Sequence, residues 1–246
     1  MGVPVKSVKS VSASEAAVLL LLHCRLAVFS NNSSIFRRFL PIFAIYWGTK
    51  NFLMQIEAWF YLNIWQVEPV MSTEFLLHFF WFGLLSSILF CLSAMLILKT
   101  NGREEVHTKV SFPQVIPFLK IAALYVPIYL LAGALLAIPL AGGAFSSTYE
   151  SLNVPIWMPL FQFGRGLLWA WIIWWIVSSH SNKHDPRVTT AFCICIFSTV
   201  QLLHPNPFML DQLRYAHLVE MSISMSLYGW LAASIYMRSS KRYKDV

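Results

Sequence analysis

The chain of 246 residues is 57% hydrophobic and only 12% charged, a composition typical of a protein that crosses a membrane several times. Its formal net charge of +7 does not indicate a nucleic-acid partner, because the basic residues occur in short loops and at the tail rather than on one soluble face. All four cysteines, Cys24, Cys91, Cys193 and Cys195, lie in apolar segments, which argues against a disulfide framework or a metal clip.

The first 36 residues contain an apolar run that is short for a span and is interrupted by polar residues at 23–25. We expect residues 1–36 to form an amino-terminal extension that is either interfacial or signal-like, since Lys6 and Lys9 precede the apolar run. A seventh span at this point would place both lysines outside, against the positive-inside rule.

Six later segments are each long and apolar enough to cross the hydrocarbon core as helices. They cover residues 39–63, 73–98, 115–140, 156–178, 188–204 and 213–237. Together they predict an all-α fold, a polytopic transmembrane bundle of six helices over residues 37–238 with a basic tail at 239–246. This division leaves no water-soluble domain.

The basic residues between these segments predict the orientation of the bundle. They gather before the first segment, in two of the connections and in the tail, as Arg37, Arg38, Lys99, Arg103, Lys109, Lys183, Arg187, Arg238, Lys241, Arg242 and Lys244. The alternate connections, residues 64–72, 141–155 and 205–212, contain no Lys or Arg. Because short cytoplasmic loops carry the excess of basic residues, we expect both ends of the six-helix core to face the cytoplasm.

Four charged side chains lie at membrane depth in the predicted spans: Lys50, Glu57, Arg165 and Glu220. A lone charge at the centre of a span costs about 2.5–3.5 kcal/mol, so we expect these groups to meet one another. Two cations and two carboxylates balance to zero. The sequence therefore predicts a neutralised cluster between the first, fourth and sixth helices, mostly in the outer half of the membrane.

Polar residues recur every three or four positions along the last segment, at Arg214, His217, Glu220, Ser224 and Tyr228. This spacing predicts one polar stripe that runs inward from the outer surface. Asp211 precedes the stripe, where we expect its carboxylate to cap the helix. The two prolines at 204–207 predict a rigid turn before it.

The cluster permits an acid/base, a ligand-binding or a purely structural interpretation. In the first, Glu57, His217 and Glu220 are the catalytic or proton-transferring residues, because desolvation disfavours a charged carboxylate and a histidine can relay protons. The expected ligand-binding residues are the cations and histidines around them, Lys50, His78, Arg165, His204 and Arg214. In the structural interpretation the same groups only fix the register of three helices.

The pattern does not favour a metal or a haem. His217 and Glu220 could ligate one ion with His204, His78 or Glu57. However, the sequence has no HExxH motif and no second His-x-x-Glu pair, and two nearby cations oppose a divalent ion. His78 and His217 could in principle ligate a haem from two helices. Histidines on apolar helices are, however, more often hydrogen-bonded core residues than haem ligands. We expect neither a metal nor a cofactor.

Several short motifs run through the chain: IEAWF at Glu57, LYVPIYLLAG in the third segment, RGLLW at Arg165, then PNPFM, RYAHLVE and YGW. Together they cover residues 40–237 and resemble a family of uncharacterised bacterial six-helix integral membrane proteins. The resemblance implies a multi-pass protein of the bacterial cytoplasmic (inner) membrane. It carries no activity over to this chain.

The expected function is an outer-half polar pocket that binds, moves or senses a small polar or amphiphilic ligand, with proton linkage. The sequence shows no internal repeat, which argues against a stand-alone carrier. Two alternatives stay open: a membrane enzyme that acts on a lipid or isoprenoid by carboxylate acid/base chemistry, and a non-catalytic subunit or assembly factor of a membrane complex. The expected partners are membrane lipids, an amphiphilic ligand and a membrane protein.

Overall fold

The computed structural model describes residues 35–64, 73–97, 114–150, 153–178, 185–203, 205 and 209–242. Regular structure within these ranges is entirely helical, which confirms the predicted all-α class. Five helical segments are long and apolar enough to cross a membrane: Thr73–Ser93, Val115–Ala141, Met158–Ser178, Pro186–Leu203 and Asp211–Ser239. The expectations for residues 1–34, for His204 and for the end of the basic tail lie outside the described residues.

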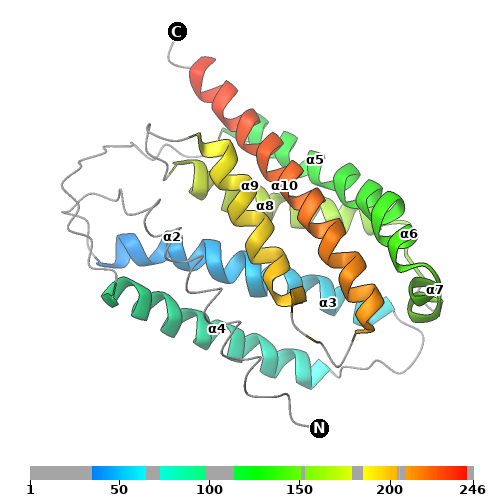
Figure 1. The fold of residues 1–246 in the computed structure, drawn as a ribbon. Coiled ribbons are helices and arrows are strands. Elements are labelled where there is room, and N and C mark those ends of the chain that lie inside the picture. The colour runs from blue at the N-terminus through cyan, green and yellow to red at the C-terminus, as the bar shows by residue number, and fades with distance from the viewer. Residues whose placement is uncertain are drawn as a thin grey trace.

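The first segment is helical from end to end but changes its winding in the middle. It consists of α2 (Ile35–Trp47), the π-helix η1 (Gly48–Phe52) and α3 (Leu53–Ile64), and Figure 1 shows them as one continuous rod. The Leu53 N–H donates to Gly48 O, the wider i→i+5 turn of a π-helix. This turn takes up one extra residue, so positions on either side of η1 are rotated from the register of a straight α-helix.

Helix α4 (Thr73–Ile97) packs along the first segment through a few polar contacts on one face. Asn51 Nδ2 donates to Ser87 Oγ at 3.0 Å, and Gln55 Nε2 donates to Phe79 O at 3.2 Å. The opposite positions of α4 expose large apolar side chains, among them Leu77, Phe79, Trp81, Phe82, Leu85 and Leu89. An exposed surface of this kind suits contact with lipid rather than with water.

The third segment ends in a sharp turn. Helix α5 (Val115–Ala132), the π-helix η2 (Gly133–Ala137) and α6 (Ile138–Ala141) form one long rod that stops at Gly142. Gly142 has φ +50°, a conformation that a residue with a Cβ rarely adopts. The turn starts the short helix α7 (Gly143–Tyr149), which therefore lies across the end of the bundle (Figure 1).

Helix α8 (Met158–Ser178) approaches α5 closely because Gly166 has no side chain. A Cβ at this position would lie 2.4 Å from the carbonyl oxygen of Ala122 on α5. Helix α9 (Pro186–Thr199), its 3-10 extension η3 (Val200–Leu203) and α10 (Asp211–Arg242) complete the bundle, with α9 and α10 side by side (Figure 1). Gly229 of α10 permits that approach, since a Cβ there would lie 2.9 Å from Cα of Ala191.

The apolar core lies between the first segment and helices α5, α8, α9 and α10. Its fully buried large side chains come from all of these elements and include Ile45, Leu53, Ile121, Trp169, Ile173, Phe197 and Tyr228. The core thus encloses the face of α8 on which Arg165 of the predicted cluster occurs.

Candidate functional site

Arg165 on α8 is the central charge of the site. Its side chain is only 2% exposed, and its Nη2 lies 2.7 Å from Oε2 of Glu57 on α3, whose side chain is 20% exposed. The guanidinium also donates from Nη1 to Gln162 Oε1 at 2.8 Å and from Nη2 to Leu53 O at 3.4 Å. The structure therefore brings together the Arg165 and Glu57 that the sequence expected to meet, across the first and fourth segments.

Tyrosines surround this ion pair, and the sequence analysis did not assign them to the site. The Arg165 guanidinium lies 5.7 Å from the ring centre of Tyr125 and 5.9 Å from that of Tyr129, both on α5. The Tyr129 hydroxyl is 2.6 Å from the hydroxyl of Tyr61 on α3. Two tyrosines four residues apart share one face of a helix, so the motif LYVPIY carried a signal for this arrangement. Facing aromatic rings stabilise a desolvated guanidinium.

A second polar group occupies α10. The Nδ1 of His217 lies 3.6 Å from Oε2 of Glu220, an ion-pair separation that is too long for a direct hydrogen bond. Ser224 Oγ donates to Glu220 Oε1 at 3.2 Å. The side chains of His217 and Glu220 are 22% and 12% exposed, so both remain reachable from outside the core. These three residues form the middle of the predicted stripe.

Tyr149 at the end of α7 contacts the α10 group. Its hydroxyl is 3.3 Å from Nε2 of His217. Burial, and secondarily the negative charge of Glu57, raises the pKa of the Tyr149 hydroxyl to about 12. Tyr149 therefore keeps its proton at neutral pH and can donate it to Nε2 of a neutral histidine. The contact with His217 therefore brings a residue of α7 to the polar group of α10.

Two buried donors of the site have no hydrogen-bond partner among the described residues: Nε of Arg165 and Nε2 of Gln162. Both side chains are almost completely buried, and an unsatisfied buried donor costs about 1–3 kcal/mol. Buried polar groups are satisfied in most folded proteins. These two donors therefore mark the part of the site that best suits an acceptor-bearing molecule.

Lys50 has a different neighbour from the one expected. Its Nζ donates to the Tyr46 hydroxyl at 3.2 Å and lies 5.3 Å from the centre of that ring. The sequence analysis placed Lys50 and Glu57, seven residues apart, on one face of a straight helix. The π-helix η1 contains Lys50, so the extra residue in its turn rotates Lys50 relative to Glu57.

Arg214 belongs to the helix end rather than to the interior site. It is 3% exposed, and its Nη1 donates to Leu202 O at 2.7 Å while Nη2 pairs with Asp211 Oδ1 at 2.8 Å. Each step of three residues falls about 60° short of a full helical turn. Arg214 and Glu220 are two such steps apart, so their side chains point away from the axis of α10 in directions about 120° apart. The single stripe expected from the sequence is therefore wrong: Arg214 lies on one side of α10, and His217, Glu220 and Ser224 form a separate group. Asp211, which was expected to cap α10, is instead its first residue and binds the Arg214 guanidinium.

His78 is the other candidate that lies apart from the site. It is exposed on α4, and its Nδ1 lies 2.8 Å from the Glu74 carbonyl oxygen of the same helix. His204 lies outside the described residues. Within the described ranges no group of three His, Cys, Asp or Glu side chains is placed to hold a metal ion together.

Replacing Arg214 with Gln is expected to destabilise the folded protein by about 1.5–3 kcal/mol, because it removes a charged donor from a buried backbone carbonyl. Asp211→Asn is the matched control. Its side chain is 73% exposed, so loss of this partner should cost under about 1 kcal/mol. Denaturation in mixed detergent micelles measures both variants. Equal losses for the two would show that the exposed ion pair, rather than the bond to Leu202 O, holds this helix end.

The chain was also compared with known proteins. No family model, no curated protein and no solved structure matches it. The function proposed below rests on the geometry of the side chains described above.

Proposed function

We propose that the protein is a six-helix, multi-pass protein of a bacterial inner membrane, with both ends of its core in the cytoplasm. Five spans are the helical segments given above, and the first segment, from Ile35 to Ile64, adds one more. This segment is helical without interruption and about 45 Å long at 1.5 Å per residue. The alternation of basic and non-basic connections supports the orientation.

In this arrangement the Arg165 site binds a small polar or amphiphilic ligand. The observation that carries the proposal is the buried Arg165–Glu57 pair, which leaves the donors Arg165 Nε and Gln162 Nε2 unsatisfied. The ligand class is a molecule with hydrogen-bond acceptors, such as a carboxylate, phosphate or carbonyl group, that both donors can reach. The tyrosine rings give the same site apolar faces, which suit the hydrocarbon part of an amphiphile.

Glu57, His217 and Glu220 make ligand binding responsive to protons. Each is partly exposed, whereas Arg165 is enclosed, so protons can reach the carboxylates and the histidine more easily than they can reach the cation. Tyr149 contacts His217 and Ser224 donates to Glu220, and a proton that passes between His217 and Glu220 would have to cross the 3.6 Å that separates them. Protonation of Glu57 would release Arg165 to pair with an anionic ligand.

An experimental structure of the full chain purified from its own membrane tests the ligand-binding proposal. We expect non-protein density within hydrogen-bond distance of Arg165 Nε or Gln162 Nε2, together with one co-purified small molecule per chain by mass spectrometry. Protein side chains that satisfy both donors, with no co-purified molecule, would overturn the proposal and favour a purely structural network.

Infrared titration of the protein in vesicles tests the proton linkage. Acidification of the wild-type protein is expected to produce a carboxylic-acid carbonyl band that decreases in Glu57→Gln and in Glu220→Gln. Glu74→Gln is the matched control for the band of an exposed carboxyl group, because Glu74 is exposed at the start of α4 and His78 contacts its backbone carbonyl rather than its carboxylate. The bands lost in the two site variants are expected at a different frequency from the band lost in Glu74→Gln. An unchanged difference spectrum in both site variants would remove the acid/base role of these carboxylates.

A further inference from the structure

A cavity with two arginines lies near the carboxyl end of α10, whereas His217 and Glu220 lie near the start of that helix. It has a volume of about 200 Å³ and is lined, among the described residues, by Arg187 of α9 and by Ser234, Met237 and Arg238 of α10. The proposed orientation places this end of both helices at the cytoplasmic surface. The ligand-binding function proposed above does not use this cavity.

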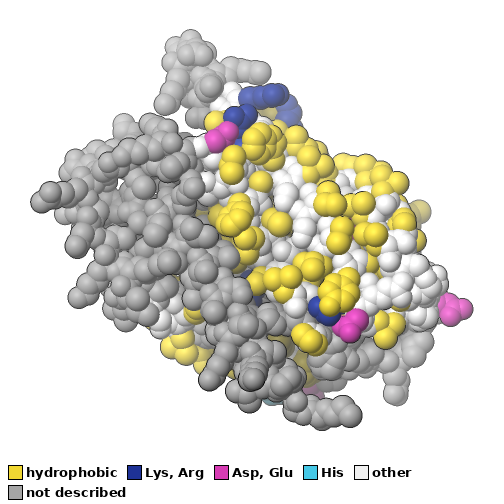
Figure 2. All heavy atoms as spheres, viewed as in Figure 1, with side chains coloured by type: hydrophobic (Ala, Val, Ile, Leu, Met, Phe, Trp, Pro, Cys, Tyr) yellow, Lys and Arg dark blue, Asp and Glu magenta, His cyan; other side chains and the backbone are white. Residues whose placement is uncertain are grey.

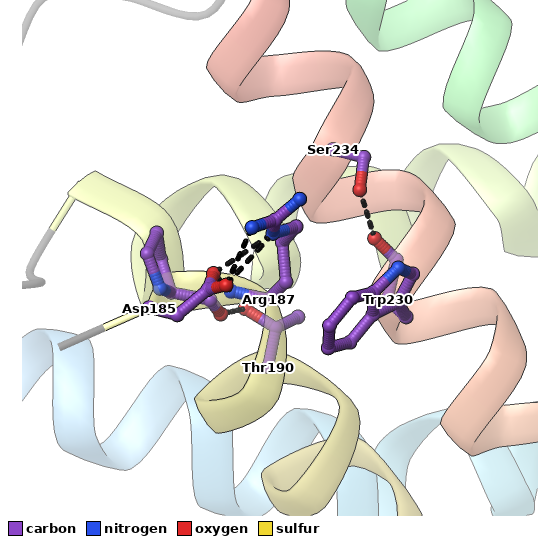
Figure 3. Close-up of polar contacts among 6 residues, drawn as sticks. Asp185, Arg187, Thr190, Trp230 and Ser234 are labelled. Atoms are coloured by element: carbon purple, nitrogen blue, oxygen red, sulfur yellow. Dashed lines mark hydrogen bonds and ion pairs between the residues drawn. The ribbon is translucent and has the colours of Figure 1, made fainter.

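Contacts on two sides hold Arg187 in place. The Asp185 carboxylate accepts from Arg187 Nε at 2.9 Å and from Nη2 at 2.6 Å, and it also accepts the Arg187 backbone N–H as the cap of α9. The guanidinium lies 5.0 Å from the ring centre of Trp230 on α10. Figure 3 shows Arg187 between Asp185 and Trp230, below the turn that carries Ser234. Asp185 occupies Nε and Nη2, so the N–H groups of Nη1 remain for another acceptor.

The charges around the cavity suit a singly charged anion. Two guanidinium groups line it, and Asp185 neutralises one of them, which leaves about one net positive charge among the described residues at the cavity. A phosphodiester carries one negative charge and several acceptor oxygens, and arginine binds such oxygens with paired hydrogen bonds.

The surface beside the cavity is apolar. Large exposed side chains follow α9 and α10 away from the two arginines, namely Val188, Phe192, Leu227, Trp230 and Leu231. Figure 2 shows this face, with basic side chains at the end of α10 and hydrophobic side chains spread over the adjoining surface. A bound molecule with a phosphate head and long hydrocarbon chains would therefore match both the cavity and its surroundings.

We propose that this cavity binds the headgroup phosphate of an anionic phospholipid from the cytoplasmic leaflet, while the acyl chains lie along the exposed faces of α9 and α10. Basic pockets between transmembrane helices bind such headgroups by the same chemistry. Free inorganic phosphate is also an anion, but it has no hydrocarbon chains to bury against the apolar surface. The apolar surface therefore favours binding of the lipid.

Native mass spectrometry of the full chain, released from neutral detergent, tests this lipid site. Dioleoyl phosphatidylglycerol is the probe, and dioleoyl phosphatidylcholine and inorganic phosphate are the comparison ligands. We expect phosphatidylglycerol to bind most tightly and Arg238→Gln to weaken its binding about fivefold, the effect of one basic residue at a membrane surface. Ser234→Leu, which fills the cavity without a change of charge, should weaken binding similarly.

Lys120→Gln is the matched control, because Lys120 is exposed on α5, is not among the residues that line the cavity and carries the same charge as Arg238. It should bind phosphatidylglycerol as the wild type does. Unchanged affinity in both Arg238→Gln and Ser234→Leu, an equal loss in Lys120→Gln, or inorganic phosphate binding as tightly as the lipid would each overturn the proposal. None of these results depends on Glu57 or Glu220, so the two proposals can fail separately.

Discussion

Replacement of Glu57 by Gln is expected to destabilise the folded bundle by about 3 kcal/mol, because it leaves the Arg165 guanidinium charged and 2% exposed without its carboxylate. Breaking a buried ion pair from one side costs about 3–5 kcal/mol, and the 20% exposure of Glu57 places this case near the lower limit. Denaturation by sodium dodecyl sulfate in mixed micelles, followed by tryptophan fluorescence, measures the loss.

The double variant Glu57→Gln with Arg165→Gln is the control for this prediction. Removal of both charges leaves no uncompensated ion, so it should recover most of the stability that the single variant loses. The same comparison separates stability from function, since the double variant is expected to fold and yet to bind no acceptor-bearing ligand. If the single and double variants are equally destabilised, side-chain packing rather than charge holds this part of the bundle.

Gly166→Ala is expected to destabilise the protein by about 3 kcal/mol, because the added Cβ would lie 2.4 Å from the Ala122 carbonyl oxygen. This oxygen belongs to backbone, so relief requires α8 and α5 to separate. Separation would also move Arg165, the preceding residue, away from the tyrosines of α5. We therefore expect Gly166→Ala to reduce ligand binding as well as stability.

Gly164→Ala is the matched control two residues earlier on the same helix. Among the described residues, no atom beyond the adjacent backbone of α8 itself lies within 4 Å of a Cβ at that position. Alanine is about 1 kcal/mol more favourable than glycine inside a helix. Gly164→Ala should thus be neutral or stabilising in the same denaturation experiment. A similar loss in both variants would mean that the close approach of α8 and α5 does not limit stability.

The sequence alone was sufficient for the helical class. It also named Arg165 and Glu57 among four charges expected to form one cluster, but of these four the structure pairs only Arg165 with Glu57, while Lys50 contacts Tyr46 and Glu220 lies with His217 and Ser224. Apolar runs of helical length can satisfy their backbone hydrogen bonds only within the helix in a membrane, so composition and length determine the class. A charge at membrane depth needs an opposite charge, so the sequence predicted that these cations and carboxylates would meet, but it did not determine which of them pair.

The ends of the helices and the winding of the first one could not be predicted in the same way. Periodicity assumes a straight α-helix, whereas η1 adds a residue to one turn and gives Lys50 a neighbour other than the one expected. The three-residue spacing on α10 likewise suggested one stripe, but the rotation between Arg214 and Glu220 directs the first to Leu202 and leaves the second near His217. Small deviations in winding add up along a helix and rotate its later side chains. Which of these side chains make contacts then depends on how the neighbouring helices pack.

The sequence by itself therefore determined which residues must avoid lipid and which kinds of partner they need. Only the tertiary structure decided that Tyr125, Tyr129 and Tyr149 share the site with the charged groups, because they come from α5 and α7, far along the chain from α10. The physical reason is that charge balance and hydrophobic length are properties of the residues themselves. The contacts between helices, in contrast, depend on how closely backbones approach, which Gly166 and Gly229 permit at single points.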